Sequence, residues 1–93
     1  MAQYITVHRA PGLLKEQWVE NAKSVHASKH ASFKQAYVNL STGFIVTIHD
    51  AESRENLEEH FEVLGFPFDE IHEIQFSQSY SEMVDMLTQM GRI

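Results

Sequence analysis

The sequence predicts an α+β domain with a four-stranded antiparallel sheet and an additional C-terminal helix. The chain has 93 residues, the usual length of one domain. Hydrophobic residues make up 43% of it, which is typical of a chain that folds around a core. Segments with strand-like alternation and segments with helical periodicity follow one another in the order strand, helix, strand, strand, helix, strand, helix.

The first half predicts three strands and a helix. "QYITVH" at 3–8 is rich in β-branched and aromatic residues, which favours a strand, and "RAPG" ends it. A helix is expected roughly over residues 14–31. "KQAYVN" at 34–39 and "GFIVTIHD" at 43–50 predict two further strands, joined by the turn "STG". The expected buried stripe of the helix, at helical spacing, is Leu14, Trp18, Ala22 and Val25.

The second half predicts two helices on either side of a strand. Asp50 is placed to cap a helix that ends near Gly65, and "EIHEIQF" at 70–76 predicts the fourth strand. Ser79 and Glu82 have the spacing of a capping box, which predicts the start of the terminal helix. The apolar positions of the two helices are Leu57, Phe61 and Leu64 in the first and Tyr80, Met83, Leu87 and Met90 in the second.

The order β-α-β-β-α-β is that of the ferredoxin-like fold, or α/β plait. We expect residues 1–78 to form this domain, with residues 79–93 as a C-terminal helical extension of it. The terminal helix is expected to be structural.

Composition excludes several classes of function. The chain has no cysteine, which rules out disulfides, zinc–thiolate sites and thiol catalysis. Its net charge of −6, with only seven basic residues, argues against binding to nucleic acid. The start has no signal-peptide pattern and no apolar run is long enough to span a membrane, so we expect a cytoplasmic protein.

The strand order expected for this fold, 4-1-3-2, brings distant polar residues to one edge of the sheet. With the first and third strands taken as parallel, His8, His49 and the segment 70–73 meet there. If Ile5 and Val7 face the helices, both histidines face away from them. Placing Ile74 on the helix side puts Glu73 on the open face with the histidines and His72 on the other face. Ile71 then also lies on the open face, so the opposite assignment of this strand stays open.

These residues predict a metal site made of His8, His49 and Glu73. Imidazole and carboxylate ligands suit nickel, zinc, cobalt or copper better than calcium or magnesium. The alternative is that these polar residues only hydrogen-bond one another at ordinary strand ends.

The other histidines are weaker candidates. His26 and His30 have a spacing that can chelate one ion on a helix, although a solvated helix flank explains them better. His60 lies beside the apolar stripe of its helix and is interpreted as a packing residue.

The span from Tyr4 to Ile74 resembles a small family of bacterial ferredoxin-like domains, mostly of unknown function, with a nickel-binding, dimeric branch. The matching segments are "VHR" at 7–9, "QAYV" at 35–38, "DAES" at 50–53 and "EHFEVLGFPFDEIHEI" at 59–74. The chain departs from the family pattern at Leu14, where a Ser or Thr cap is usual, at Thr47, where a Cys is common, and in the added terminal helix.

We therefore expect a protein that binds or handles a divalent transition metal of the nickel type. Two alternatives stay open: a small dimeric enzyme resembling cofactor-free oxygenases, with His8 or His49 as a general base, and a non-catalytic ligand-binding module. We also expect a homodimer formed through the open sheet face, because apolar side chains would otherwise face water there. The residues expected on that face are Tyr4, Tyr37, Ile45 and Ile71.

Overall fold

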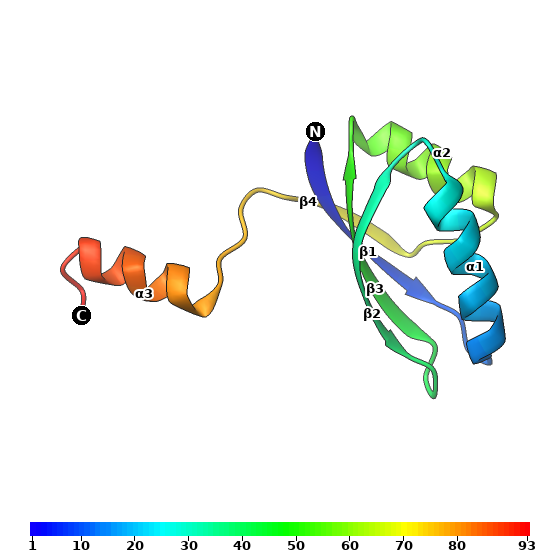
Figure 1. Ribbon diagram of the computed structural model, residues 1–93, viewed down its shortest axis with the longest axis horizontal. Helices are drawn as coiled ribbons and strands as arrows, with labels where there is room; N and C mark the ends of the chain where they lie inside the picture. Colours follow the sequence, from blue (N-terminus) through cyan, green and yellow to red (C-terminus); the bar gives the residue numbers. More distant parts are fainter.

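A computed structural model of the chain, which describes residues 1–93, has the ferredoxin-like fold with an extra C-terminal helix (Figure 1). The sheet order is β2-β3-β1-β4, as predicted. All three neighbouring pairs are antiparallel, so the expectation that the first and third strands run parallel is wrong. The strands are β1 (Ala2–Arg9), β2 (Ser32–Asn39), β3 (Phe44–Ala51) and β4 (Glu70–Ile74).

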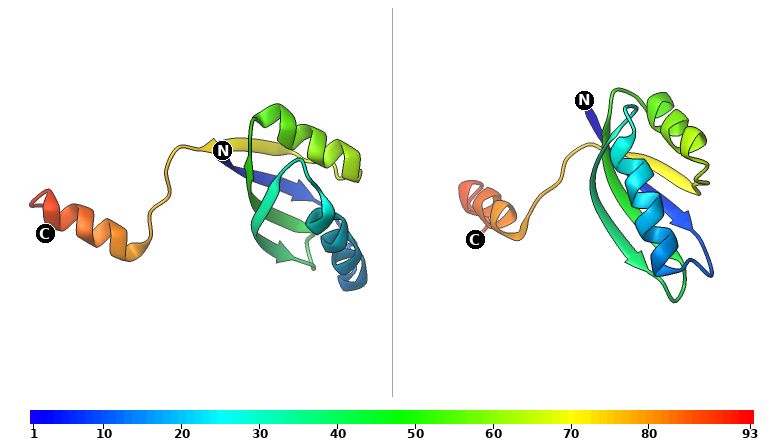
Figure 2. Two further views of the ribbon diagram at one scale, coloured as in Figure 1. Left: turned by 45° about the horizontal axis from the view of Figure 1, so that its top comes forward. Right: turned by 45° about the vertical axis from the view of Figure 1, so that its right-hand side comes forward.

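Helices α1 (Lys15–Ala27) and α2 (Arg54–Leu64) both cover the same face of the sheet, as Figures 1 and 2 show. Helix α2 is capped by Ser53, whose side chain accepts a hydrogen bond from the Asn56 backbone, and not by Asp50, which belongs to β3. It ends at Gly65, which has a φ of 73°, the left-handed conformation that glycine adopts without strain.

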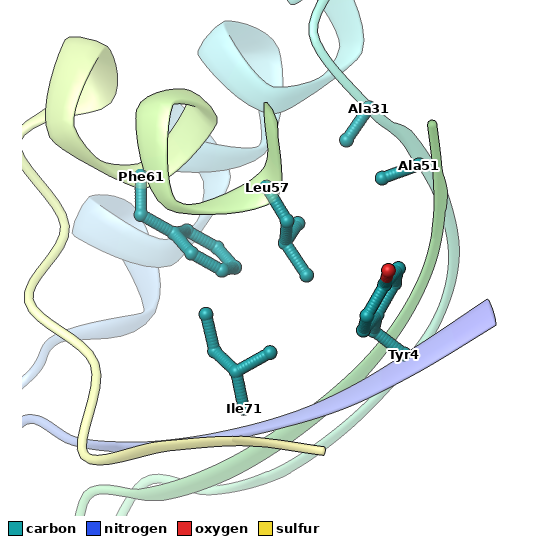
Figure 3. Packing of buried hydrophobic residues seen from close by; sticks show 6 residues of the cluster. All are labelled: Tyr4, Ala31, Ala51, Leu57, Phe61 and Ile71. Atoms are coloured by element: carbon teal, nitrogen blue, oxygen red, sulfur yellow. The ribbon is translucent and has the colours of Figure 1, made fainter. Parts of the chain in front are cut away.

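The hydrophobic core lies between α2 and the sheet (Figure 3). Leu57 and Phe61 of α2 point toward Tyr4 and Ile71 on the strands, with two alanines at one side. Helix α1 contributes no buried residue, so the predicted stripe on this helix does not form part of the core. The six core residues are Tyr4, Ala31, Ala51, Leu57, Phe61 and Ile71.

The helix-covered face of the sheet is the reverse of the predicted one. Tyr4, Thr6 and His8 are buried beneath the helices, whereas Ile5 and Val7 lie on the open face and are only half-buried. The predicted alternation of β4 relative to β1 is confirmed. Ile71 pairs with Thr6 and Glu73 with Tyr4, so both lie on the same face of the sheet as His8. Both faces of the sheet carry β-branched residues. The alternation in the sequence therefore predicts that every second residue is buried, but not which of the two faces the helices cover.

The reversal also corrects the surface expected to form a dimer. Tyr4, Ile45 and Ile71 are buried under the helices. Tyr37 pairs opposite Val46 and is 63% exposed, and it alone of the four lies on the open face. The open face of β1 and β3 instead carries Ile5, Val7, Val46 and Ile48.

Helix α3 (Tyr80–Gln89) stands away from the sheet and the other helices (Figures 1 and 2). Its predicted capping box is confirmed: the Ser79 backbone donates to the Glu82 carboxylate, and the Ser79 hydroxyl accepts from the Glu82 backbone, both at 3.1 Å. None of the three helices combines the length and hydrophobicity needed to cross a membrane.

Candidate functional site

Three histidines lie close together beneath α2. His8 of β1 and His49 of β3 come from the sheet, and His60 comes from the helix. The rings of His49 and His60 are 5.2 Å apart between centroids, and both contact the ring of Phe61 edge-on. His49 and His60 are almost fully buried, and His8 is 8% exposed.

The same short sequence positions both sheet histidines. "TVH" at 6–8 and "TIH" at 47–49 place a threonine and a histidine two residues apart, on one face of each strand. Thr6 pairs directly opposite Thr47. The two hydroxyls are hydrogen-bonded to each other, and each also bonds to the histidine of its own strand, at 2.8 Å for His8 and 3.0 Å for His49.

Burial keeps all three rings neutral at pH 7. It lowers the pKa of His8 against the opposing effects of the Pro67 carbonyl and Asp69. It lowers the pKa of His49 to about 4, with His60 and His8 contributing in the same direction. The pKa of His60 is lowered by burial and then by His30 and His8. A neutral imidazole has one N–H and one lone pair.

The direction of the hydrogen bonds decides where the protons are. The Pro67 carbonyl can only accept, so His8 donates to it from Nδ1 over 2.9 Å. The lone pair of His8 Nε2 then accepts from the Thr6 hydroxyl, whose oxygen in turn accepts from the Thr47 hydroxyl. The Thr47 hydroxyl donates its single proton to Thr6, so its oxygen accepts a hydrogen bond from the Nδ1–H of His49. It follows that His49 Nε2 carries an unprotonated lone pair.

That lone pair has no partner in the protein. His49 Nε2 and His60 Nε2 are the two buried side-chain polar atoms without a hydrogen bond. The Nδ1 atom of His60 is bonded to the Ser28 hydroxyl at 2.7 Å. A buried polar atom left unpaired costs about 1–3 kcal/mol, which makes two such atoms on adjacent rings a feature that requires an explanation.

The predicted ligands His8, His49 and Glu73 do not form one cluster. Both histidines lie under the helices and not on the open face. His8 pairs opposite Ile45 and His49 opposite Tyr4, so their Cα atoms are offset by roughly 13 Å along the strands, although both rings contact Phe61. Glu73 and His49 flank Tyr4 on opposite sides, which separates them by about 10 Å across the sheet. No group of three or more His, Asp or Glu side chains is arranged to hold a metal ion.

Of the predicted set, only His49 has a free ring nitrogen, because both nitrogens of His8 are hydrogen-bonded. That His8 and Glu73 ligate a metal stays a prediction. His60, interpreted from the sequence as a packing residue, supplies the second free nitrogen. The sequence feature that could have predicted this cluster is the Thr-x-His pattern, which occurs in both central strands.

The remaining histidines lie elsewhere. Helix α1 ends at Ala27, so His26 is in its last turn and His30 is outside it, and the helical spacing expected for a chelating pair is absent. His72 is exposed on the open face and pairs with the Glu70 carboxylate at 3.0 Å.

Comparison with known proteins relates this fold to a metal-linked family. Residues 4–74 match the family described as nickel responsive protein SCO4226-like. The chain belongs to this family. The crystal structure of SCO4226 from Streptomyces coelicolor A3(2) superposes with a TM-score of 0.73 at 28% identity, over 82% of this chain and 99% of that one. No curated protein matches the chain. The residues matched by the SCO4226-like family end before α3.

Proposed function

We propose that the chain binds a divalent transition-metal ion of the nickel type, with His49 and His60 as its protein ligands. The observation that carries the proposal is the pair of buried, unpartnered Nε2 atoms on adjacent neutral rings. One ion bound to both nitrogens would remove both unpaired polar atoms. Imidazole nitrogens are suitable ligands for nickel, copper and zinc.

The surroundings of the two rings fit this role. Ligating histidines usually hydrogen-bond through their second ring nitrogen, which fixes the tautomer and the ring orientation. His49 does so to Thr47 and His60 does so to Ser28, in each case through Nδ1. The low pKa of His49 keeps its ring unprotonated well below neutral pH. Metal ions bind the unprotonated ring, so the site is ready to bind at physiological pH.

The name of the family supports a role in nickel response, and a binding or handling role suits the site better than catalysis. Two protein ligands leave the other coordination positions to water or to small molecules. The chain lacks the Gly-rich phosphate loop and the nucleophile motifs typical of known enzymes.

Isothermal titration of the untagged protein with nickel tests the proposal. We expect one ion per chain in the wild type, and loss of that binding in His49→Gln and in His60→Gln. The matched controls are His26→Gln and His72→Gln, which change exposed histidines. Equal losses in the controls, or full binding by both buried-site variants, would overturn the assignment.

A further inference from the structure

A second feature of the molecule is a cavity of about 1010 Å³ between α1 and the sheet. Small-molecule sites are commonly cavities of roughly 300–1,000 Å³ lined mainly by apolar side chains. Half of the residues that line this cavity are hydrophobic, among them Trp18, Val25, Phe33, Phe61, Leu64 and Phe66.

The cavity exists because α1 does not pack tightly on the sheet. This helix has no buried residue, and its Trp18 and Val25 are only half-buried. The sheet beneath it presents the polar side chains of Thr47 and His49 beside the apolar Phe33 and Ile45. An apolar guest between helix and sheet would cover the side chains that α1 leaves partly exposed.

The charge around the cavity selects the kind of guest. The chain has 13 acidic residues and a net charge of −6, yet no Asp or Glu lines the cavity. Two of its seven basic residues, Arg9 and Lys34, do line it. Each is held by a carboxylate that is not in the lining, Arg9 by Asp69 at 2.9 Å and Lys34 by Asp50 at 3.4 Å. An acidic protein thus has a cavity with an apolar wall and cationic groups.

We propose that this cavity binds an amphipathic organic anion, with its apolar body between α1 and the sheet and its carboxylate toward Lys34. The lack of acidic side chains in the lining disfavours an organic amine in the same space. His49 lines this cavity and His60 does not, so the cavity adjoins one of the two orphan nitrogens, but the anion is argued only from the apolar and basic side chains of the lining. The inference therefore does not depend on metal binding.

Trp18 provides a direct test, because it is the chain's one tryptophan and it lines the cavity. Three probes with the same ten-carbon chain, decanoate, decanol and decylammonium, are titrated against its fluorescence below their micelle concentrations. We expect saturable binding of decanoate, with decanol at least about tenfold weaker and no binding of decylammonium. Tenfold corresponds to about 1.4 kcal/mol. Equal binding of all three probes, or no change with decanoate, would overturn the proposal.

Two pairs of variants locate the binding. Ala22→Phe fills the cavity and should abolish the decanoate response, whereas Ala27→Phe, a residue of the same helix that does not line it, should not. Lys34→Met should weaken decanoate about threefold to tenfold, as expected for one half-exposed charge, while Lys29→Met should have no effect. Circular dichroism verifies folding of each variant. Indistinguishable effects within either pair would contradict the proposed location.

Discussion

At the scale of single residues, a chain of hydrogen bonds determines the chemistry of the histidine cluster. It runs from the Pro67 carbonyl through His8, Thr6 and Thr47 to His49. Each hydroxyl has one proton to donate, so the direction of the first bond sets that of all the others. The chain ends in a lone pair on His49 Nε2 that no protein atom uses.

Removing one hydroxyl from this chain should destabilise the fold. Thr47→Val keeps the shape of the side chain but leaves the Nδ1–H of His49 without an acceptor. We expect the free energy of unfolding to fall by about 1–3 kcal/mol, measured by urea denaturation. Thr88→Val, at an exposed position on α3, is the control and should change it by less than about 0.5 kcal/mol. Equal effects of the two changes would mean that the buried hydroxyl is not needed.

Stability should also decrease in mild acid. Burial lowers the pKa of His49 to about 4 in the folded chain, from about 6.5 when unfolded. Between these values the unfolded chain binds more protons, so this contribution to stability is complete above about pH 6.5 and is lost as the pH falls toward 4. We expect His49 alone to account for about 2 kcal/mol between pH 7 and pH 5, with His8 and His60 adding to it.

Urea unfolding at the two pH values measures this difference. His49→Gln should reduce the pH dependence by that amount, while His72→Gln, at an exposed position, should leave it unchanged. A His49→Gln protein with the full pH dependence of the wild type would refute the assignment.

At the scale of elements, the sequence predicted the order and nature of all seven, because turn and cap residues such as Gly65 and Ser79 act locally. The side of the sheet could not be predicted in the same way. Apolar Ile5 and Val7 alternate with Tyr4, Thr6 and His8, and which set is buried depends on where Leu57 and Phe61 of α2 pack. The antiparallel pairing of β1 and β3 places His8 and His49 at different positions along the strands, and Glu73 lies across Tyr4 from His49, so metal binding by this set stays a prediction.

Helix α3 should be dispensable for metal binding. It stands away from the sheet and from α2, the elements that carry the three histidines, and its capping box supports it locally. We expect deletion of residues 79–93 to leave the nickel affinity measured by titration unchanged. Loss of binding in a truncated chain that is still folded would place part of the site on this segment.

At the scale of the whole molecule, two apolar surfaces have no partner within the chain. One is the open face of the sheet, defined by Ile5, Val7, Val46 and Ile48. The other is α3, where Tyr80 is 71% exposed and Met90 60% exposed. A helix of ten residues is marginally stable alone in water, so it gains from packing against another surface. We expect a second copy of the chain to cover these surfaces, which makes the protein a homodimer.

Light scattering coupled to size-exclusion chromatography tests the dimer. The wild type should be dimeric at micromolar concentration, and Val46→Lys on the open face should shift it to monomer, because the added charge would be buried at the interface. Val63→Lys introduces the same charge on α2, where the side chain is 66% exposed, and should stay dimeric. A monomeric wild type would contradict the expectation.

The central claim, that His49 presents an unprotonated Nε2 to a metal, is tested most directly by the imidazole nitrogen resonances. Long-range proton–nitrogen NMR at pH 7 distinguishes the two neutral tautomers of each histidine, and zinc serves as a diamagnetic probe. We predict the Nδ1–H tautomer for His49, and a shift of the Nε2 signals of His49 and His60 when one equivalent of zinc is added. The Nε2–H tautomer in His49, or Nε2 signals that do not move with zinc, would contradict the account.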